Sequence, residues 1–368
     1  MSAFSRRHFL QKLGLGTAFT LAYPTIQVHK MASINPEKKL HIALCGLGRY
    51  AGLVAIGLKS CRHCRLTGIV TGTPAKAAAW QKEYTIPEKN IYNYDNFDSI
   101  VHNKDVDLVY ITLPNALHKD MVLRAAAAGK QVIVEKPMAL TAIDCREMIS
   151  ACEKAGVALA VGYRLHFVPY HMEIKRLGQE KVFGQVRLIE ASLGYKSSDP
   201  NEWRLKKTLS GGGPLMNIGL YCVQSSRYVL GEEPVSVTAQ FGPVTNNTLF
   251  TEVEESITWQ LNFPSGAVCN SSSSYNATFD RFFAAADEGS FELSPGLSYG
   301  PFKGKTSAGP LNFPNINQQA EQVDAIAAFI LQNKPLPQHI SGEEGWKDMK
   351  VLEAIYAAAE SGKKVTIL

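Results

Sequence analysis

The feature that most constrains the fold is a glycine turn between an apolar segment and a helical one. Residues 40–45 (LHIALC) have strand length, and Gly46-Leu47-Gly48-Arg49-Tyr50-Ala51 follows directly. Residues 53–58 then continue with helical character. Gly46 permits a tight turn, Gly48 lets the backbone approach a ligand, and the helix N-terminus offers free N–H groups to a pyrophosphate. This strand, G-x-G-x-x-A turn and helix predict a dinucleotide-binding unit.

Strands and helices alternate over the residues that follow this turn. The apolar runs predict strands at 66–71, 108–113, 131–134 and 157–162, and the helical stretches between them include 119–128 and 142–155. Alternation at this spacing predicts an α/β fold with a doubly wound parallel sheet. We therefore expect a Rossmann dinucleotide-binding domain over residues 38–162.

The end of the second predicted strand bears on which dinucleotide binds. A site that prefers NAD usually places Asp or Glu there, to bind the ribose 2′-hydroxyl. This chain has Thr71, Gly72 and Thr73, with Lys76 a turn later and Arg49 in the glycine turn. Hydroxyls and cations suit a 2′-phosphate, so the sequence favours NADP, with NAD as the alternative. The competing interpretation is that Lys76 and Arg49 are solvated surface charges.

The second half of the chain has a different period. Apolar residues alternate over 235–241 and 257–263, which predicts half-buried antiparallel strands, and 185–193 and 281–286 add two more. Residues 292–318 predict a long loop, and the helical faces at 323–330 and 351–359 precede Gly362, which is placed to end the last helix. We expect an α+β domain for substrate binding and oligomerisation over 163–340, and a C-terminal helix within 341–368.

The N-terminal segment carries an export pattern. Ser5-Arg6-Arg7-His8-Phe9-Leu10-Gln11-Lys12 matches a twin-arginine signal, and a moderately apolar stretch follows at 13–22. A surface amphipathic helix with a chance Arg-Arg pair is the alternative. The pattern predicts a signal and arm over 1–37, recognition by the twin-arginine export machinery, and a periplasmic location. That pathway carries folded proteins, which directs the search towards cofactor enzymes.

The net charge depends on this same segment. Residues 1–30 contain Arg6, Arg7, Lys12 and Lys30 and no acidic residue, and removing these four charges from the formal +5 leaves +1. Because residues 31–368 are nearly neutral, their charge gives no reason to expect nucleic acid as a partner. No apolar run reaches the roughly 18–20 residues that a bilayer-spanning helix needs.

The seven cysteines do not suggest a disulfide scaffold, because their number is odd and the chain is long. Cys61-Arg62-His63-Cys64 has the spacing of a redox or metal motif. It lacks the second pair that would complete a zinc site. We expect a structural or incidental role for this motif and no metal centre.

Several motifs together resemble the Gfo/Idh/MocA oxidoreductase family, and within it the periplasmic glucose–fructose oxidoreductases. They are Gly46-Leu47-Gly48, residues 113–118 (LPNALH), Glu135-Lys136-Pro137 at a predicted strand end, and residues 211–221 (GGGPLMNIGLY). The likeness continues through 162–166, 202–204, 227–234 and 342–345 and so covers nearly the whole chain after residue 38.

The resemblance implies catalytic roles for Lys136 and Tyr221. Ligands of doubly wound sheets bind at the carboxyl ends of strands, where Lys136 falls. The family places an acid/base group at the position of Tyr221, and Pro214 suits the first turn of a helix on which Asn217 and Tyr221 share one face. We expect Lys136 to favour the phenolate and lower the pKa of Tyr221. Asn217 stands where the family usually has Asp, and it can orient a sugar hydroxyl but not accept its proton.

The resemblance also implies the lining of the site. The residues expected to bind substrate are Asn217, Tyr163, Arg164, His166, Trp203 and Arg204. Packing for Trp203 and an interior position for His166 are the alternatives. The residues expected to bind the cofactor are Gly46, Leu47, Gly48, Arg49, Tyr50, Thr71, Thr73, Lys76, Leu113, Pro114, Asn115, His118, Glu135 and Lys136.

These expectations combine into an exported sugar oxidoreductase with tightly bound NADP. It would oxidise one sugar at its C1 hydroxyl and pass the hydride to a second carbonyl sugar. A glycosidase of the same fold that uses NAD, or a non-catalytic carbohydrate-binding protein, are the alternatives. The resemblance also implies an open sheet whose free face meets a second subunit. We expect that face to be broadly apolar, and hence a homodimer or homotetramer.

Overall fold

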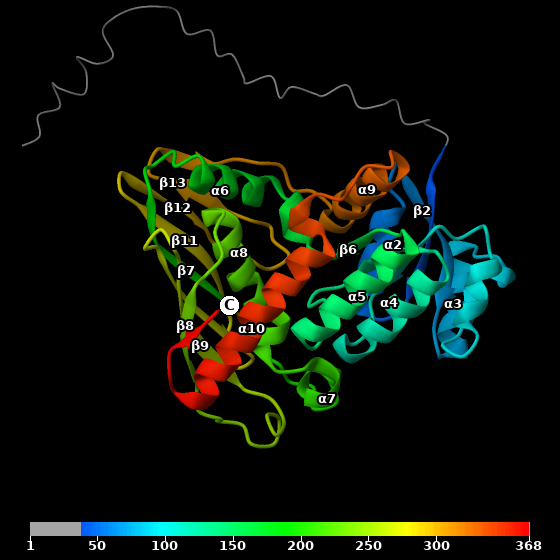
Figure 1. Cartoon of the computed structure of the whole chain (residues 1–368), viewed down its shortest axis with the longest axis horizontal. Helices are drawn as coiled ribbons and strands as arrows, with labels where there is room; N and C mark the ends of the chain where they lie inside the picture. Colours follow the sequence, from blue (N-terminus) through cyan, green and yellow to red (C-terminus); the bar gives the residue numbers. More distant parts are fainter. Residues whose placement is uncertain (1–37, 368) are drawn as a thin grey trace, which may run out of the picture. The chain divides into compact units, whose positions relative to one another are not determined.

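The computed structural model describes residues 38–367, and the expected export signal at 1–37 lies outside this range. The predicted Rossmann sheet is confirmed: its six strands are ordered β3-β2-β1-β4-β5-β6 and every neighbouring pair is parallel. The sheet is drawn blue to green in Figure 1. The strands are β1 (Leu40–Cys45), β2 (Cys64–Val70), β3 (Ile91–Tyr92), β4 (Leu108–Ile111), β5 (Gln131–Val134) and β6 (Leu159–Val161).

Helices follow these strands as the alternation predicts. The core of the sheet is apolar, with Ile42 and Leu44 of β1 and all of β4 fully buried, as expected for strands covered on both faces. The helices are α2 (Arg49–Leu58), α3 (Pro74–Tyr84), α4 (His118–Ala127) and α5 (Ala142–Ala155), with short helices η1 (Glu88–Asn90), η2 (Phe97–His102) and η3 (Asn115–Leu117).

The second half forms a nine-stranded sheet in the order β14-β13-β12-β11-β7-β10-β9-β8-β15. It is mostly antiparallel, as predicted, with a parallel pair between β7 and β10. Its strands are β7 (Val186–Gly194), β8 (Ser236–Phe241), β9 (Ser256–Asn262), β10 (Val268–Ser274), β11 (Phe279–Ala286), β12 (Gly289–Leu293), β13 (Gly304–Thr306), β14 (Gly309–Leu311) and β15 (Val365–Thr366). The predicted loop at 292–318 therefore contains the β13–β14 hairpin. Its two strands are too short and too rich in glycine for alternating apolar residues to reveal them in the sequence.

One face of this sheet is covered by helices α6, α8 and α10 (Figure 1). Gly362 ends α10 with φ 63°, as predicted. Helix α9 packs instead against α2 of the Rossmann half. The bounds are α6 (Pro169–Gln179), α7 (Lys207–Ser210), α8 (Leu220–Leu230), α9 (Gln318–Leu331) and α10 (Gly342–Ser361), with short helices η4 (Arg164–Phe167), η5 (Trp203–Leu205), η6 (Leu215–Gly219) and η7 (Gln338–Ile340).

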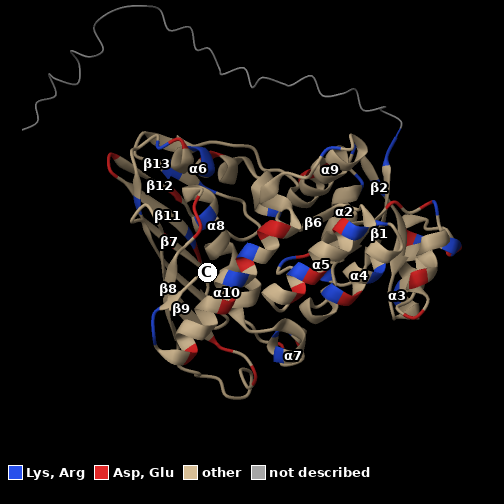
Figure 2. Ribbon diagram, in the orientation of Figure 1, with Lys and Arg blue, Asp and Glu red and all other residues tan. Residues whose placement is uncertain are grey.

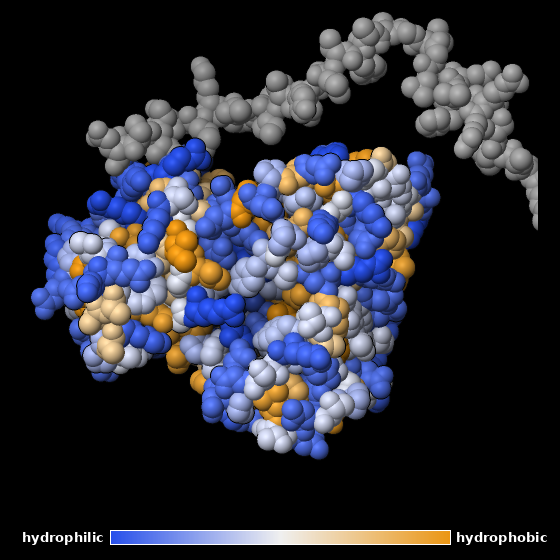
Figure 3. Space-filling view, turned by 180° about the vertical axis from the view of Figure 1, so that it is seen from behind, coloured by the Kyte–Doolittle hydropathy of each residue, from blue (hydrophilic) through white to orange (hydrophobic). Residues whose placement is uncertain are grey.

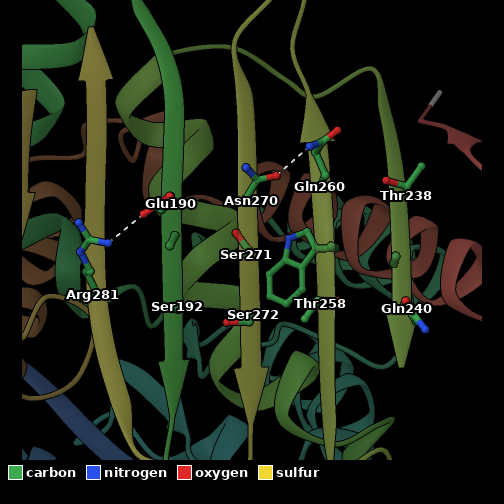
Figure 4. Close-up of a pocket in the computed structure, with 13 residues that line it drawn as sticks. Glu190, Ser192, Thr238, Gln240, Thr258, Gln260, Asn270, Ser271, Ser272 and Arg281 are labelled. Atoms are coloured by element: carbon green, nitrogen blue, oxygen red, sulfur yellow. Dashed lines mark hydrogen bonds and ion pairs between the residues drawn. The ribbon is translucent and has the colours of Figure 1, made fainter. Parts of the chain in front are cut away.

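The other face of the nine-stranded sheet is polar. Figure 4 shows Thr238, Gln240, Thr258 and Gln260 on this face, and Gln260 donates to Asn270 at 2.8 Å. Glu190 and Arg281 pair at 2.8 Å on the neighbouring strands (Figure 4). The expectation of a broad apolar face is therefore wrong, because the outward positions of β8, β9 and β10 carry Thr, Gln, Asn and Ser.

The surface carries both signs of charge. Figure 2 shows basic and acidic residues interspersed over α3, α4, α5 and α10. The opposite view shows hydrophilic residues with smaller hydrophobic areas between them (Figure 3). Among the described residues, none of the helices has the length and hydropathy to cross a membrane.

Candidate active site

The glycine turn leaves the N-terminus of α2 open. Gly46 has φ +92°, and a Cβ built there would lie 2.7 Å from Leu113 Cδ2, so only glycine fits. Gly48 is the N-cap of α2; among residues 38–367 no side chain caps the helix, and a Cβ at Gly48 would meet nothing within 4 Å. The first N–H groups of the helix therefore face open space, which fits the pyrophosphate of a dinucleotide.

The loop between β2 and α3 carries hydroxyls, and cations lie in α3 and in the glycine turn. Thr71 Oγ1 accepts a hydrogen bond from Thr73 N at 3.2 Å, and Thr73 is the N-cap of α3. Arg49 and Lys76 are exposed, and the Tyr94 ring packs 3.0 Å from a Cβ built on Gly72. This set of groups fits a ribose phosphate better than a bare 2′-hydroxyl.

Lys136 lies at the carboxyl end of β5, where the Lys136–Pro137 peptide bond is cis. Its Nζ donates to the Asn217 carbonyl oxygen at 2.6 Å and lies 4.5 Å from the centroid of the Tyr221 ring. Burial lowers the pKa of Lys136 to about 7; Glu135 opposes this shift, and Arg204 and Arg164 add to it. The ammonium therefore loses its proton near neutral pH, where general bases are most effective.

The hydroxyl of Tyr221 is held by Arg164 and not by Lys136. Arg164 Nε donates to Tyr221 Oη at 3.1 Å, and the guanidinium carbon lies 4.7 Å from the Tyr221 ring centroid. Burial raises the pKa of Tyr221, and Arg164 opposes this shift. The expectation that Lys136 lowers the pKa of Tyr221 is therefore wrong, because Lys136 faces the ring and desolvation outweighs the nearby charge.

Arg164 is itself enclosed by protein groups. Its side chain is 2% exposed, and its Nη atoms donate to Ser298 O at 2.9 Å, to Leu297 O at 3.1 Å and to Gln318 Oε1. The Tyr299 ring covers the guanidinium at 4.3 Å. With these donors engaged by protein groups, Arg164 is placed to position Tyr221, and direct binding of substrate by Arg164 stays a prediction.

The helix that presents Tyr221 starts with a π-helical turn, η6, before α8. Glu254 binds this start through Gly213 N at 2.9 Å and Leu215 N at 3.2 Å. A Cβ on Gly212 would lie 2.0 Å from Tyr356 Oη, and one on Gly213 would lie 2.4 Å from Glu254 O. The glycine run at 211–213 therefore serves close packing around a half-buried carboxylate cap.

Two family models match the chain. "Oxidoreductase family, NAD-binding Rossmann fold" matches residues 40–163, and "GFO/IDH/MocA C-terminal domain" matches residues 171–292. The chain belongs to the Gfo/Idh/MocA oxidoreductase family. It is thus an NAD(P)-dependent oxidoreductase with the α/β fold of that family.

Similar proteins of this family include an aldose–aldose oxidoreductase from Caulobacter crescentus. Its crystal structure, complexed with glycerol, has a TM-score of 0.86 and 40% identity over 89% of this chain and 100% of that one. A D-xylose 1-dehydrogenase [NADP(+)] from Haloarcula marismortui is 28% identical over 83% of this chain and 86% of its own length. A D-xylose 1-dehydrogenase (NADP(+)) 2 from Haloferax volcanii is 27% identical over 86% of this chain and 98% of its own length.

Asn217, Trp203 and Arg204 lie around the Lys136–Tyr221 pair of this oxidoreductase. Asn217 Nδ2 donates to Tyr195 Oη at 3.3 Å, and the main-chain carbonyl of Asn217 accepts the hydrogen bond from Lys136 Nζ. Arg204 is half-buried, donates to Glu202 at 2.9 Å and lies 4.5 Å from the Trp203 ring centroid. Their partial exposure leaves Trp203 and Arg204 available to a ligand.

Other predicted residues hold the scaffold instead. Tyr163 is fully buried and donates to Asp348 at 2.6 Å, and His166 packs against Tyr228 with ring centroids 4.3 Å apart. His118 is buried with its ring nitrogens 3.0 Å from Pro137 O and 2.9 Å from Leu113 O. The structure buries these three side chains among protein groups, and direct ligand contact by them stays a prediction.

Asn115 and Pro114 flank the same strand end. Asn115 is buried and donates to Ser210 O at 2.8 Å, which ties the β4 end to α7. Pro114 is the N-cap of η3 and is half-buried, and Leu47 and Leu113 are buried in the core beside the turn. Asn115 therefore positions the end of β4 relative to α7. Pro114 remains partly exposed at this strand end.

Sequence reasoning missed the network behind Glu135. Tyr110 donates to Glu135 Oε1 at 2.7 Å, and Gln322 of α9 donates to the Tyr110 hydroxyl at 2.8 Å. Burial raises the pKa of Glu135. The Tyr50 hydroxyl is buried without a hydrogen-bond partner among residues 38–367, and burial raises its pKa, with Glu135 adding to the shift. An unsatisfied buried hydroxyl beside the turn fits a site completed by a bound group.

Proposed function

We propose that this protein is an exported sugar oxidoreductase that keeps NADP bound, oxidises the C1 hydroxyl of one sugar and reduces a second carbonyl sugar. The observation that carries the proposal is the placement of Lys136 Nζ beside Tyr221 and Asn217 at the carboxyl end of β5. That end of a doubly wound sheet is where ligands bind. The names of the relatives, an aldose–aldose oxidoreductase and two xylose dehydrogenases that use NADP, support the substrate class and the nucleotide. The proposal follows the resemblance to glucose–fructose oxidoreductases.

The protein groups supply the proton chemistry, and a bound nicotinamide would supply the hydride acceptor and donor. Lys136, with its pKa near 7, accepts the proton of the sugar hydroxyl in the oxidation and returns it in the reduction. Tyr221 stays neutral because burial raises its pKa, and its hydroxyl accepts the bond from Arg164. Its own proton is then directed away from Arg164, where it can hydrogen-bond the reacting oxygen.

Asn217 orients this pair instead of exchanging protons. Its main-chain carbonyl accepts a hydrogen bond from Lys136, and its side-chain amide donates to Tyr195. An amide donates and accepts hydrogen bonds but does not ionise. The proton transfer therefore rests on Lys136, and the hydroxyl of Tyr221 supplies a hydrogen bond to the reacting oxygen.

The first experiment is to denature the purified protein and identify the nucleotide that it releases. About one NADP per chain supports the closed cycle, and sugar pairs are then tested for coupled oxidation and reduction. A chain that releases no nucleotide, and turns over only with added NADP, would contradict the retained cofactor. Net hydrolysis of a glycoside without net redox change would identify a glycosidase of the same fold.

A substitution at Tyr221 tests the mechanism. Tyr221→Phe should lower turnover by ~10²-fold or more while nucleotide stays bound, because one hydrogen bond to the reacting oxygen is lost. Tyr228→Phe, a half-buried tyrosine on the same helix, is the matched control. Sugar binding without turnover in the unsubstituted protein would instead support a carbohydrate-binding protein.

The export proposal rests on Ser5-Arg6-Arg7 and the apolar stretch behind it. Replacing both arginines with lysine in the full chain should leave the protein in the cytoplasm, with the signal uncleaved. Fractionation of cells that express either chain measures this. Export that is insensitive to both substitutions would exclude the twin-arginine pathway.

A further inference from the structure

The Cys61-Arg62-His63-Cys64 motif does not take part in the proposed reaction, yet the fold completes it. Asp324 of α9 lies beside it, and the ligand atoms of Cys61, Cys64 and Asp324 are all within 4.8 Å of one another and buried. The carboxylate comes from a helix about 260 residues later in the sequence. The second pair of ligands that the sequence lacks is thus partly replaced by tertiary structure.

We propose that Cys61, Cys64 and Asp324 form a structural Zn²⁺ site, with a solvent molecule in the fourth position. Zn²⁺ prefers tetrahedral sets of thiolate, imidazole and carboxylate ligands, with cysteines spaced as in C-x-x-C. His63 Nδ1 lies 2.9 Å from Asp324 Oδ2, so His63 orients this carboxylate from outside the ligand set. Binding forms two metal–sulfur bonds, and each thiol releases its proton to solvent.

The charges around this cluster suit a site with two thiolates and a carboxylate. Zn²⁺ with these three ligands carries a net charge of −1, which needs a compensating cation in a buried position. Arg62 Nε lies 3.6 Å from Asp324 Oδ2, and Lys39 Nζ donates to Cys61 O at 3.2 Å. Both cations lie at the outer edge of the cluster, where they can offset this charge.

The site joins two elements that come from distant parts of the chain. Cys61 follows the C-terminus of α2, and its thiol lies 3.6 Å from Gly57 O and 3.5 Å from Ala320 O of α9. His63 N also donates to Asp324 Oδ1 at 2.6 Å. A bound metal would therefore fix α2 against α9 and so stabilise the helix whose N-terminus faces the expected nucleotide.

The test uses the full chain, reduced and stripped of metal by a chelator, with Co²⁺ as a spectroscopic probe and Zn²⁺ as competitor. We expect a single Co²⁺ per chain with strong sulfur-to-cobalt charge-transfer absorption, displaced by Zn²⁺. Zn²⁺ should also raise the Tm of the chain. Cys64→Ser should lower the affinity for Co²⁺ by ~100-fold or more, and Asp324→Asn by ~10-fold or more, since both remove a ligand.

Cys152→Ser, which alters a buried cysteine on α5, is the control and should leave Co²⁺ binding unchanged. Asp324→Asn keeps the shape of the side chain, so it tests the ligand role if Cys64→Ser fails to fold. Absence of stoichiometric binding in the reduced chain, or equal binding in Cys64→Ser and the unsubstituted chain, would overturn the proposal. The proposal would also be overturned if Asp324→Asn changed neither the affinity of the chain for Co²⁺ nor the energy of the charge-transfer band.

Discussion

Lys136 is the residue whose environment most directly sets the chemistry. Burial lowers its pKa to about 7, so its amine is mostly uncharged above that pH and protonated below it. We expect kcat/KM for sugar oxidation to rise with pH and level off above about 7, because oxidation needs the uncharged amine as proton acceptor. The reduction should show the opposite trend, falling as the pH rises through about 7.

The measurement is a pH profile of both directions for the unsubstituted chain and for Lys136→Arg. The guanidinium does not lose its proton in this range, so Lys136→Arg should lower activity by ~10²–10⁴-fold and flatten the profile. Lys119→Arg, a half-buried cation paired with Asp144, serves as the control. An unchanged profile in Lys136→Arg would assign the titrating group to another residue.

Arg164 is predicted to act through Tyr221. Arg164→Lys keeps the charge but cannot hold Tyr221, Ser298 and Leu297 at once, so we expect kcat to fall by ~10–100-fold with little change in KM. A rise in KM with kcat unchanged would instead indicate that Arg164 binds the sugar.

At the scale of elements, helices α8 and α10 are joined by a buried ion cluster. Arg227 is 3% exposed and binds Asp348, Glu344 at 2.9 Å and Glu233 at 2.6 Å. Arg227→Met should lower the free energy of unfolding by about 3–5 kcal/mol, because it leaves the buried Asp348 carboxylate without its cation. Denaturant unfolding measures this value.

The matched control is Arg176→Met on α6, which pairs with Glu173 and Glu180 but is 45% exposed. Its cost should be about 0–1 kcal/mol, since exposed ion pairs contribute little. Equal costs for the two substitutions would show that the buried cluster contributes no more than a surface pair.

Most of the elements could be predicted from the sequence, since local spacing determines them. Strands β1 and β5 and helix α5 have the predicted bounds, because each is an apolar run or periodic stretch between clear breaks. The π-helical turn at Leu215–Gly219 could not be predicted, since it depends on Glu254, which binds the turn from a distant loop. For the same reason the sequence placed Asn217 and Tyr221 on a regular helix.

The candidate site was predictable where a motif carried it. Gly46, Gly48, Lys136 and Tyr221 come from motifs, and the structure brings the last two together. Burial and long-range contacts determine the rest: Tyr163 and His118 follow strand ends, as ligand-binding residues do, but their side chains turn into the core. Gln318 and Tyr299 lie more than 130 residues from Arg164, and no local pattern signals their contact.

At the scale of the whole molecule, the open sheet face decides how copies of this chain can associate. We propose a homodimer or homotetramer, as the family resemblance implies, and the polar face of β8, β9 and β10 is its expected interface. Thr258→Arg at the middle of this face should dissociate the assembly, because it places an unpaired cation between two polar surfaces. Light scattering after size exclusion measures the mass of each variant.

Lys82→Arg on α3, far from this sheet in the sequence, is the control for that substitution. An assembly whose mass does not change in Thr258→Arg uses a different surface. A monomer in the unsubstituted chain would show that a polar sheet face is stable in water without a partner.

The packing of α9 against α2 has a consequence for synthesis of the chain. Proteins are made from the N-terminus, and domains usually fold as they emerge. Here Gly57 lies against Ala320, and Tyr110 bonds to Gln322, so the first half lacks part of its packing until the ribosome has passed residue 331. Stable binding of a nucleotide would then occur only when translation is almost finished. For a protein proposed to be exported already folded, this dependence on α9 means that the folded, nucleotide-bound state forms only when synthesis of the chain is nearly complete.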